Sequence, residues 1–377
     1  MSPTLRARPI GHGQLPQPLM DPIGMWVDVT PAVLLAVPLL PFTSPQFGCQ
    51  TIGLSPHNPA VIYCGCCYEG IFRSADYGKT WTKVNTGTHG SDLDLGRPWA
   101  LAVDPTDENT LYTVAGFGSG AQGVFKSTDG GVNYTQMMDA TTLSNTTADV
   151  YCITINPANH NHVLVSFHSP FPSSSDSGVI ESTDGGNTWA IHGPITGVGT
   201  GCYIFFLGQD DGGAANSAYW LLTTQSGGMW RTTNSGSTWT QVHSAHSMQH
   251  GGEQVYRSGT GVLYTGCAGA VLIRSTDNGQ SWSAIGNGSN GLPSTADGYN
   301  AIFGDGVYIY CCLTNTGVAT NTPVQWYYSL DGDGQNWSLL DGVNWQDGPM
   351  SAAVDLANQI IYASCWDQGI LRLKTGH

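Results

Sequence analysis

The sequence predicts an all-β protein, a seven-bladed β-propeller whose ring is closed by a strand from the N-terminal part of the chain. Three observations predict this fold. Six copies of one turn motif run along the chain and begin at residues 74, 127, 182, 232, 275 and 329. The copies lie 43 to 55 residues apart, a repeat length close to that of propeller blades. Several short strand-like runs recur in each interval, and no segment has the periodicity of a long amphipathic helix.

The turn motif follows the approximate pattern Ser/Thr-x-Asp-x-Gly-x-Thr/Ser-Trp, as in STDGGNTW at Ser182–Trp189. The Asp carboxylate can accept hydrogen bonds from backbone N–H groups at the bend, and the Gly can adopt a positive φ without steric cost. The closing Trp can pack beside the next sheet. These properties suit a tight hairpin turn, so we interpret the motif as structural and not catalytic.

Taken in order, the chain divides into an arm, one isolated strand, six full blades and a last incomplete blade. Residues 1–22 contain five prolines and no strand pattern, so we predict an arm along the surface. The stretch Met25–Thr30 resembles the strand that follows each turn motif, whereas the last blade lacks that strand. Pairing of the two ends would leave no exposed sheet edge. The predicted domain spans 23–377, with blades at about 49–86, 97–138, 149–192, 201–243, 253–286, 299–340 and 349–375 plus 23–31.

The composition narrows the classes of function. A formal net charge of −15 argues against nucleic acid or an anionic membrane as the partner, because either would require a basic surface. The 50 glycines and a charged fraction of only 10% fit an all-β protein with many turns. The apolar run at 32–42 is too short to cross a bilayer and is broken by Pro38 and Pro41.

Four triplets of the glycosylation type, at Asn133, Asn145, Asn287 and Asn336, favour an exported protein. The start of the sequence lacks the basic and then apolar layout of a signal peptide. We therefore expect a secreted, extracellular protein with no leader visible in this chain. We also expect a monomer with a polysaccharide or oligosaccharide as its partner.

The six motif copies resemble the Asp box (BNR repeat) of sialidase-like β-propellers. The resemblance implies that the Asp-box turns share one face and that ligands bind on the opposite face, near the axis. True sialidases use three arginines and usually six blades, so the closer likeness is to propellers that degrade polysaccharides. Xyloglucan-cleaving relatives pair two propellers and place a catalytic Asp before a Gly-Gly-Ala-Tyr-Arg stretch. The matching stretch here, Cys67–Arg73, has Cys67 at that position.

The richest loop for chemistry is residues 85–99. It contains His89, Asp92, Asp94, Arg97 and Trp99. We predict that His89, Asp92, Asp94 and Arg97 take part in catalysis, since they combine proton transfer with recognition of a carboxylate. Trp99 would be a stacking platform for a sugar. The alternative is a solvated loop whose acids cap turns.

A second candidate loop has three histidines between His243 and His250, followed by Tyr256 and Arg257. We predict His250 and Tyr256 as catalytic groups and Arg257 as a substrate-binding group. Short loops of other blades add the substrate-binding candidates Tyr68, Glu69, His168, Tyr299, Trp366 and Asp367.

Cys66, Cys267, Cys311 and Cys365 fall at similar positions near the ends of second strands, where they would ring the upper channel. We predict them as small apolar residues at a crowded position; the less favoured alternative is a thiolate metal cage. We predict no cofactor and no protein-bound metal, and leave open a structural cation on the axis.

These features lead to one hypothesis and one alternative. The hypothesis is a carbohydrate-active enzyme that cleaves a polysaccharide in the central funnel, as a glycoside hydrolase or as a uronate lyase. The alternative is a non-catalytic propeller, a lectin or scaffold that binds carbohydrate or protein. Titratable groups that converge in the funnel would favour the enzyme.

Overall fold

The structure is a computed structural model. It describes residues 21–35, 48–116, 122–208, 217–246, 255–267, 271–285, 290–293, 298–314, 324–343, 351–364 and 369–376. Nearly all of the predicted arm therefore lies outside the described residues.

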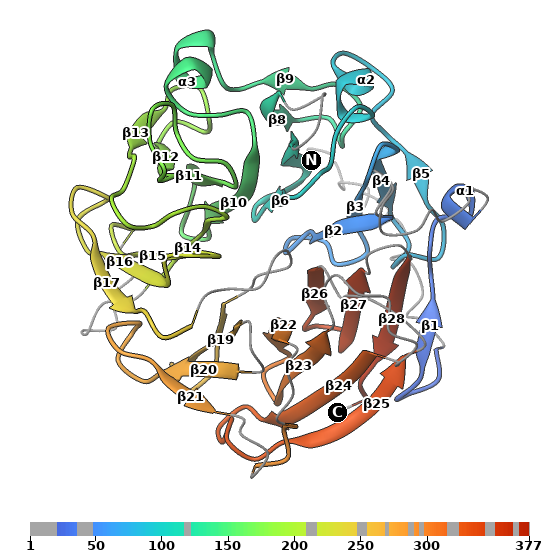
Figure 1. Cartoon of the computed structure of the whole chain (residues 1–377). Coiled ribbons are helices and arrows are strands. Elements are labelled where there is room, and N and C mark those ends of the chain that lie inside the picture. The colour runs from blue at the N-terminus through green and yellow to red at the C-terminus, as the bar shows by residue number, and fades with distance from the viewer. Residues whose placement is uncertain are drawn as a thin grey trace, which may run out of the picture.

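Seven four-stranded antiparallel sheets are arranged around one axis, which confirms the predicted seven-bladed propeller (Figure 1). In each of the first six blades the strands follow chain order from the axis outwards. Blade 1 consists of β2 (Cys49–Leu54), β3 (Ile62–Cys66), β4 (Gly70–Ser74) and β5 (Thr82–Lys83). Blade 2 consists of β6 (Leu101–Asp104), β7 (Asp107–Ala115), β8 (Gly123–Ser127) and β9 (Thr135–Gln136). Blade 3 consists of β10 (Val150–Asn156), β11 (Asn159–Phe167), β12 (Val179–Ser182) and β13 (Ala190–His192).

The remaining blades repeat this order. Blade 4 consists of β14 (Tyr203–Phe206), β15 (Trp220–Thr223), β16 (Met229–Thr232) and β17 (Thr240–His243). Blade 5 consists of β18 (Tyr256–Arg257), β19 (Leu263–Cys267), β20 (Val271–Ser275) and β21 (Ser283–Ile285). Blade 6 consists of β22 (Gly298–Gly304), β23 (Tyr308–Thr314), β24 (Val324–Leu330) and β25 (Ser338–Val343).

Blade 7 closes the ring with strands from both ends of the chain. Its three inner strands are β26 (Ser351–Asp355), β27 (Ile360–Ser364) and β28 (Ile370–Lys374), and its outer strand is β1 (Trp26–Asp28). β1 pairs antiparallel with β28, with Trp26 opposite Leu373. The buried Arg372 adds a side-chain link, because its guanidinium donates to Asp21 and to the carbonyl of Tyr77 in blade 1. The predicted closure by the N-terminal strand is therefore confirmed.

The turn motifs adopt the predicted hairpin geometry. In blade 3, Ser182 Oγ donates to Asp184 Oδ1 at 2.8 Å and accepts from Gly186 N at 2.7 Å. Asp184 then accepts from both the backbone N and the hydroxyl of Thr188, at 2.9 and 2.6 Å. The indole of Trp189 donates to Met137 O of the preceding blade at 2.8 Å. This box thus binds its own turn, and its Trp joins two blades.

Helical structure in the described residues is confined to short loop segments. These are α1 (Ala32–Leu35), α2 (Gly90–Leu93) and α3 (Ala140–Asn145). None of the described helices is long and apolar enough to cross a membrane. The apolar core lies between neighbouring blades, where Trp220 and Trp326 are fully buried.

Candidate functional site

Strand direction gives the propeller two distinct faces. The Asp boxes connect the third and fourth strands of each blade, and these turns lie at one face, here called the Asp-box face. The inner strands begin and the second strands end at the opposite face, here called the upper face. The residues around Gln50, Trp99, Asp149 and His168 lie at such strand ends and belong to the upper face.

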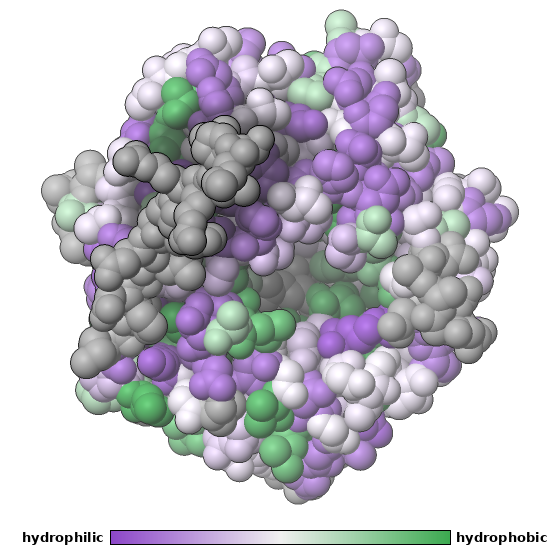
Figure 2. All heavy atoms as spheres, turned by 180° about the vertical axis from the view of Figure 1, so that it is seen from behind, coloured by the Kyte–Doolittle hydropathy of each residue, from purple (hydrophilic) through white to green (hydrophobic). Residues whose placement is uncertain are grey.

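A cavity of about 210 Å³ occupies the axis between the inner strands. No charged side chain is among its described lining residues, which come from blades 1, 2, 3, 4 and 7: Gln50, Thr51, Ile52, Trp99, Ala100, Leu101, Tyr151, Cys152, Ile153, Thr154, Tyr203, Phe205, Ser351 and Ala352. Figure 2 looks along the axis from behind the view of Figure 1 and shows a surface hollowed near its centre, bordered by both hydrophobic and hydrophilic residues. The cavity wall is therefore neutral and mixed in polarity.

Gln50 is the most unusual polar residue of this wall. It is only 2% exposed, and neither its Nε2 nor its Oε1 has a hydrogen-bond partner among the described residues. A buried polar group without a partner costs about 1–3 kcal/mol. Native structures usually satisfy such a group with water or a ligand. Gln50 is thus positioned to bind a polar molecule in the cavity.

Aromatic side chains from three blades meet at the upper end of the cavity. Tyr151 contacts Trp99 edge-on at 5.2 Å between ring centroids, His168 at 4.9 Å and Tyr203 at 4.5 Å. Gln225 Nε2 donates to the Tyr151 hydroxyl at 2.8 Å. We call Trp99, Tyr151, His168 and Tyr203 the aromatic cluster. It offers ring surfaces of the kind that bind sugars.

A carboxylate adjoins the cluster through His168. Asp149 Oδ2 lies 3.2 Å from His168 Nδ1 and accepts from the Ser169 hydroxyl at 2.6 Å. Asp149 is 8% exposed, and its other oxygen, Oδ1, has no hydrogen-bond partner among the described residues. The pair resembles the arrangement in which an acid orients a histidine for proton transfer. An open carboxylate oxygen also offers an acceptor to a ligand hydroxyl.

The loop at 85–99 is divided by the structure. Its first part forms α2 at the outer edge of the ring (Figure 1). There His89 Nδ1 lies 2.8 Å from Asp92 Oδ2, and Asp94 forms an ion pair with Lys83 at 2.9 Å. Its last part reaches the upper face, where Arg97 forms a backbone bridge with Gly116. The structure therefore separates His89, Asp92 and Asp94 from Trp99 and the cavity.

Tyr68 and Glu69 lie in the short loop after β3, on the upper face. Tyr68 N donates to Gly96 O at 3.1 Å, and Tyr68 and Trp99 pack against Cys67. Glu69 is half-buried, and its carboxylate makes no hydrogen bond or ion pair with a described residue. The structure thus brings Tyr68, Trp99 and His168 into one continuous region with Tyr151.

Three other candidates are held in the framework. Tyr256 donates to Asp331 in the sixth Asp box at 2.5 Å. Arg257 donates to Leu207 O at 2.5 Å and to Asn278 in the fifth Asp box at 2.6 Å. Tyr299 is fully buried and donates to Pro293 O at 3.0 Å. Tyr256 and Arg257 therefore belong to the Asp-box face and do not meet the aromatic cluster.

The candidates His250, Trp366 and Asp367 lie outside the described residues. Sequence reasoning missed Gln50, Asp149, Tyr151 and Tyr203. A signal was present, because each of these residues stands at or next to the start of an inner strand.

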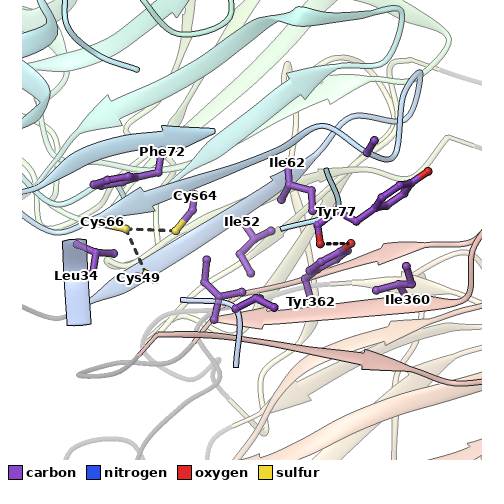
Figure 3. Packing of buried hydrophobic residues seen from close by; sticks show 13 residues of the cluster. Leu34, Cys49, Ile52, Ile62, Cys64, Cys66, Phe72, Tyr77, Ile360 and Tyr362 are labelled. Atoms are coloured by element: carbon purple, nitrogen blue, oxygen red, sulfur yellow. Dashed lines mark hydrogen bonds between the residues drawn. The ribbon is translucent and has the colours of Figure 1, made fainter. Parts of the chain in front are cut away.

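Cys66, Cys267 and Cys311 are buried in apolar clusters, in agreement with the prediction, and Cys365 lies outside the described residues. Cys66 also lies beside two other thiols, which was not predicted. Its Sγ lies 3.2 Å from that of Cys49 and 3.3 Å from that of Cys64 (Figure 3). Burial raises the pKa of the Cys64 and Cys66 thiols, whereas hydrogen bonds from Cys64 and Cys66 lower that of Cys49. The sequence signal was the presence of three cysteines in four residues at 64–67, where Cys64 and Cys67 have a Cys-x-x-Cys spacing; the expectation that no cysteines have this spacing was wrong.

Comparison with known proteins relates the chain to other propellers. A family model described as "Sortilin, neurotensin receptor 3" matches residues 69–197. A xyloglucanase of Hypocrea jecorina is 26% identical over 283 residues, which cover 64% of this chain and 33% of that protein. The xyloglucanase Xgh74A of Acetivibrio thermocellus is 30% identical over 100 residues, 22% of this chain and 12% of that protein. The chain thus spans a third or less of the curated relatives that it matches.

Solved structures support the same fold. A GH74 xyloglucanase from Xanthomonas campestris superposes with a TM-score of 0.64 at 16% identity, covering 92% of this chain and 53% of that chain. YCF48 from Cyanidioschyzon merolae superposes with a TM-score of 0.59 at 13% identity, covering 93% of this chain and 99% of that chain. At these identities the likeness shows the propeller fold alone.

Proposed function

We propose that the protein binds a polysaccharide at the upper end of the axial cavity and cleaves it there as a glycoside hydrolase. One observation carries the proposal: the aromatic cluster adjoins two buried polar groups, Gln50 and Asp149, that have unused hydrogen-bonding atoms. The match to proteins named xyloglucanases supports a polysaccharide as the substrate.

Binding would use the two kinds of surface that sugars present. The half-buried ring of Trp99 would pack against the apolar face of a sugar ring, and the buried Tyr151 would hold it in place. The Gln50 amide can both donate to and accept from hydroxyl groups, and Asp149 Oδ1 can accept from one. Because the described cavity wall carries no charge, a neutral polysaccharide fits it better than a uronate polymer does. This favours hydrolysis over a lyase reaction.

Hydrolysis of a glycoside requires one group that protonates the leaving oxygen and one that activates water or attacks the sugar. Asp149 and Glu69 are the carboxylates that we assign to these roles. His168 would position Asp149 and share its proton. Neither His89 nor Tyr256 has a step in this proposal, since the structure holds them away from the aromatic cluster.

The test is incubation of the purified protein with a xyloglucan and with a uronate polysaccharide, followed by measurement of reducing ends and of ultraviolet absorbance. We expect new reducing ends from the neutral polymer without the absorbance of an unsaturated product. Asp149→Asn should lower turnover about 100-fold or more, the usual contribution of a proton-transfer group. Trp99→Ala should weaken binding about 30-fold, as expected when a contact worth about 2 kcal/mol is lost.

His160→Gln is the matched control. His160 Nδ1 lies 2.8 Å from Asp104 Oδ2, in another His–Asp pair that belongs to the Asp-box face. The variant should retain full activity. Equal losses in His160→Gln and His168→Gln would contradict the proposed site, and absorbance from the uronate polymer would assign a lyase instead.

A non-catalytic binding propeller is the second candidate. Two observations favour it. No second carboxylate contacts Asp149 among the described residues. The superposition with YCF48 also covers almost the whole of both chains, so the two are of similar extent. Retention of a polysaccharide without any cleavage, lost in Trp99→Ala, would establish this function in place of hydrolysis. Export and a monomeric state stay predictions.

A further inference from the structure

Blade 1 contains a buried group of three cysteines that has no part in the proposed polysaccharide site. Cys49 begins β2, and Cys64 and Cys66 lie two residues apart on β3, so their side chains leave the same face of the blade. The three sulfur atoms all lie within 4.8 Å of one another. Each residue is 0% exposed. We call Cys49, Cys64 and Cys66 the thiol triangle (Figure 3).

The surroundings of the thiol triangle are apolar. Leu34 and Phe72 belong to the same buried cluster, together with Ile52, Ile62 and residues of blade 7 such as Ile370. Figure 3 shows Leu34 and Phe72 close to the sulfur atoms. Hard ions such as Mg²⁺ and Ca²⁺ prefer oxygen ligands, whereas the three clustered side-chain donors of the triangle are all sulfur.

We propose that the thiol triangle is a binding site for a soft, monovalent metal ion, with Cu(I) as the ion whose preferences it fits. Soft thiolate ligands select Cu(I), zinc and iron–sulfur clusters over the harder ions, and ligand number then decides among these. An ion about 2.3 Å from each of three sulfurs in one plane holds them roughly 4 Å apart. The observed separations of 3.2 and 3.3 Å, with none above 4.8 Å, need only small side-chain rotations to reach that spacing.

Ligand number separates Cu(I) from Zn²⁺. Structural zinc sites almost always have four ligands. The described residues offer no fourth His, Cys, Asp or Glu to the group, and the sequence at 36–48 contains none. On binding, the sulfur ligands lose thiol protons to the solvent, and the oxidation state of the metal does not change.

The experiment loads the reduced full-length protein with Cu(I) in the absence of oxygen, in competition with a Cu(I) chelator, and repeats the loading with Zn²⁺. We expect one Cu(I) per chain, an ultraviolet charge-transfer band, and three sulfur neighbours in X-ray absorption. Cys49→Ala, Cys64→Ala and Cys66→Ala should each weaken copper retention at least tenfold. Cys202→Ala, at a buried cysteine of blade 4 outside the triangle, should not.

Circular dichroism and thermal unfolding without metal identify any variant that fails to fold, and a thiol titration before loading verifies that the cysteines are free. If free thiols are present and no copper is retained, or if the three variants match Cys202→Ala, the proposal is overturned. Retention of zinc in preference to copper would overturn the assignment of a three-coordinate monovalent ion.

Discussion

The two faces of the propeller use polar residues in opposite ways. On the Asp-box face, the acidic side chains of two boxes bind the protein itself: the carboxylate of Asp184 accepts from its own turn, and Asp331 accepts from Tyr256 and Gly259 of the preceding blade. On the upper face, Gln50 and one oxygen of Asp149 have no partner among the described residues, although both side chains are buried. Satisfied polar groups stabilise a fold, and open ones indicate where a ligand or water must bind.

Aromatic residues show the same contrast. Tyr256 and Tyr151 both belong to inner strands, but Tyr256 lies at the Asp-box end of its blade, where its hydroxyl donates a hydrogen bond to Asp331. Tyr151 instead faces the cavity and contacts three other rings of the aromatic cluster. Residue type alone therefore does not distinguish a framework residue from a site residue here. Its hydrogen-bond partners do.

The largest effect on stability should come from the Asp-box face. Ser182→Ala removes the acceptor of Gly186 N and a donor to Asp184, and it leaves a buried N–H without a partner. We expect a loss of about 1–3 kcal/mol in the free energy of unfolding, with unchanged retention of a polysaccharide. Denaturant unfolding and a binding assay measure the two quantities.

Ser175→Ala, at an exposed serine in a loop of the same blade, is the control and should change neither quantity. A loss of binding in Ser182→Ala without a loss of stability would reverse the roles assigned to the two faces.

A smaller, pH-dependent effect should come from Glu181, which bridges His162 at 2.8 Å and His192 at 3.0 Å in blade 3. Burial alone would raise the pKa of Glu181, but hydrogen bonds from the two histidines outweigh it and lower the pKa from 4.5 to about 2. A carboxyl group with a lowered folded-state pKa stabilises the fold above its unfolded-state pKa and loses that contribution as pH falls. The wild type should therefore lose this stability between about pH 4.5 and pH 2.

Glu181→Gln should be less stable than the wild type at neutral pH and should depend less on pH in that window. Denaturant unfolding at several pH values measures this. Glu69→Gln on the upper face removes no ion pair of the described residues, and its stability should follow the wild-type pH profile. If the free energy of unfolding of Glu181→Gln falls with pH as steeply as that of the wild type, the bridge contributes nothing to acid stability.

The smallest effect on stability should come from Gln50→Leu, which replaces a buried side chain that has no partner by an apolar one of similar size. Unlike the loss of a satisfied hydrogen bond, this change should leave thermal stability unchanged or slightly raised. Polysaccharide binding should weaken, since the amide is its proposed contact. A marked destabilisation would mean that tightly bound water already satisfies Gln50, and the contrast between the faces would weaken accordingly.

Much of the fold was predictable because the repeats encode it locally. The turn motif specifies its own hairpin through bonds within eight residues, such as those from Ser182 to Gly186 and from Asp184 to Thr188. The closure of the ring was also predictable from the sequence, because Met25–Thr30 resembles the outer strand that the last blade lacks. On the upper face, Tyr68, Trp99 and His168 were found because they lie at strand ends. Whether they bind substrate stays a prediction.

The sequence by itself determined the blade count, the turn geometry and the ring closure, since these depend on short-range patterns that recur along the chain. Only the tertiary structure decided which polar groups found partners. It placed His89 in α2 at the rim, tied Tyr256 to Asp331 across 75 residues and brought Trp99, Tyr151 and Tyr203 together from three blades. The thiol triangle likewise joins two strands of blade 1. The physical reason is that hydrogen bonds, ring contacts and thiol separations depend on distances between blades and strands, which no local pattern records.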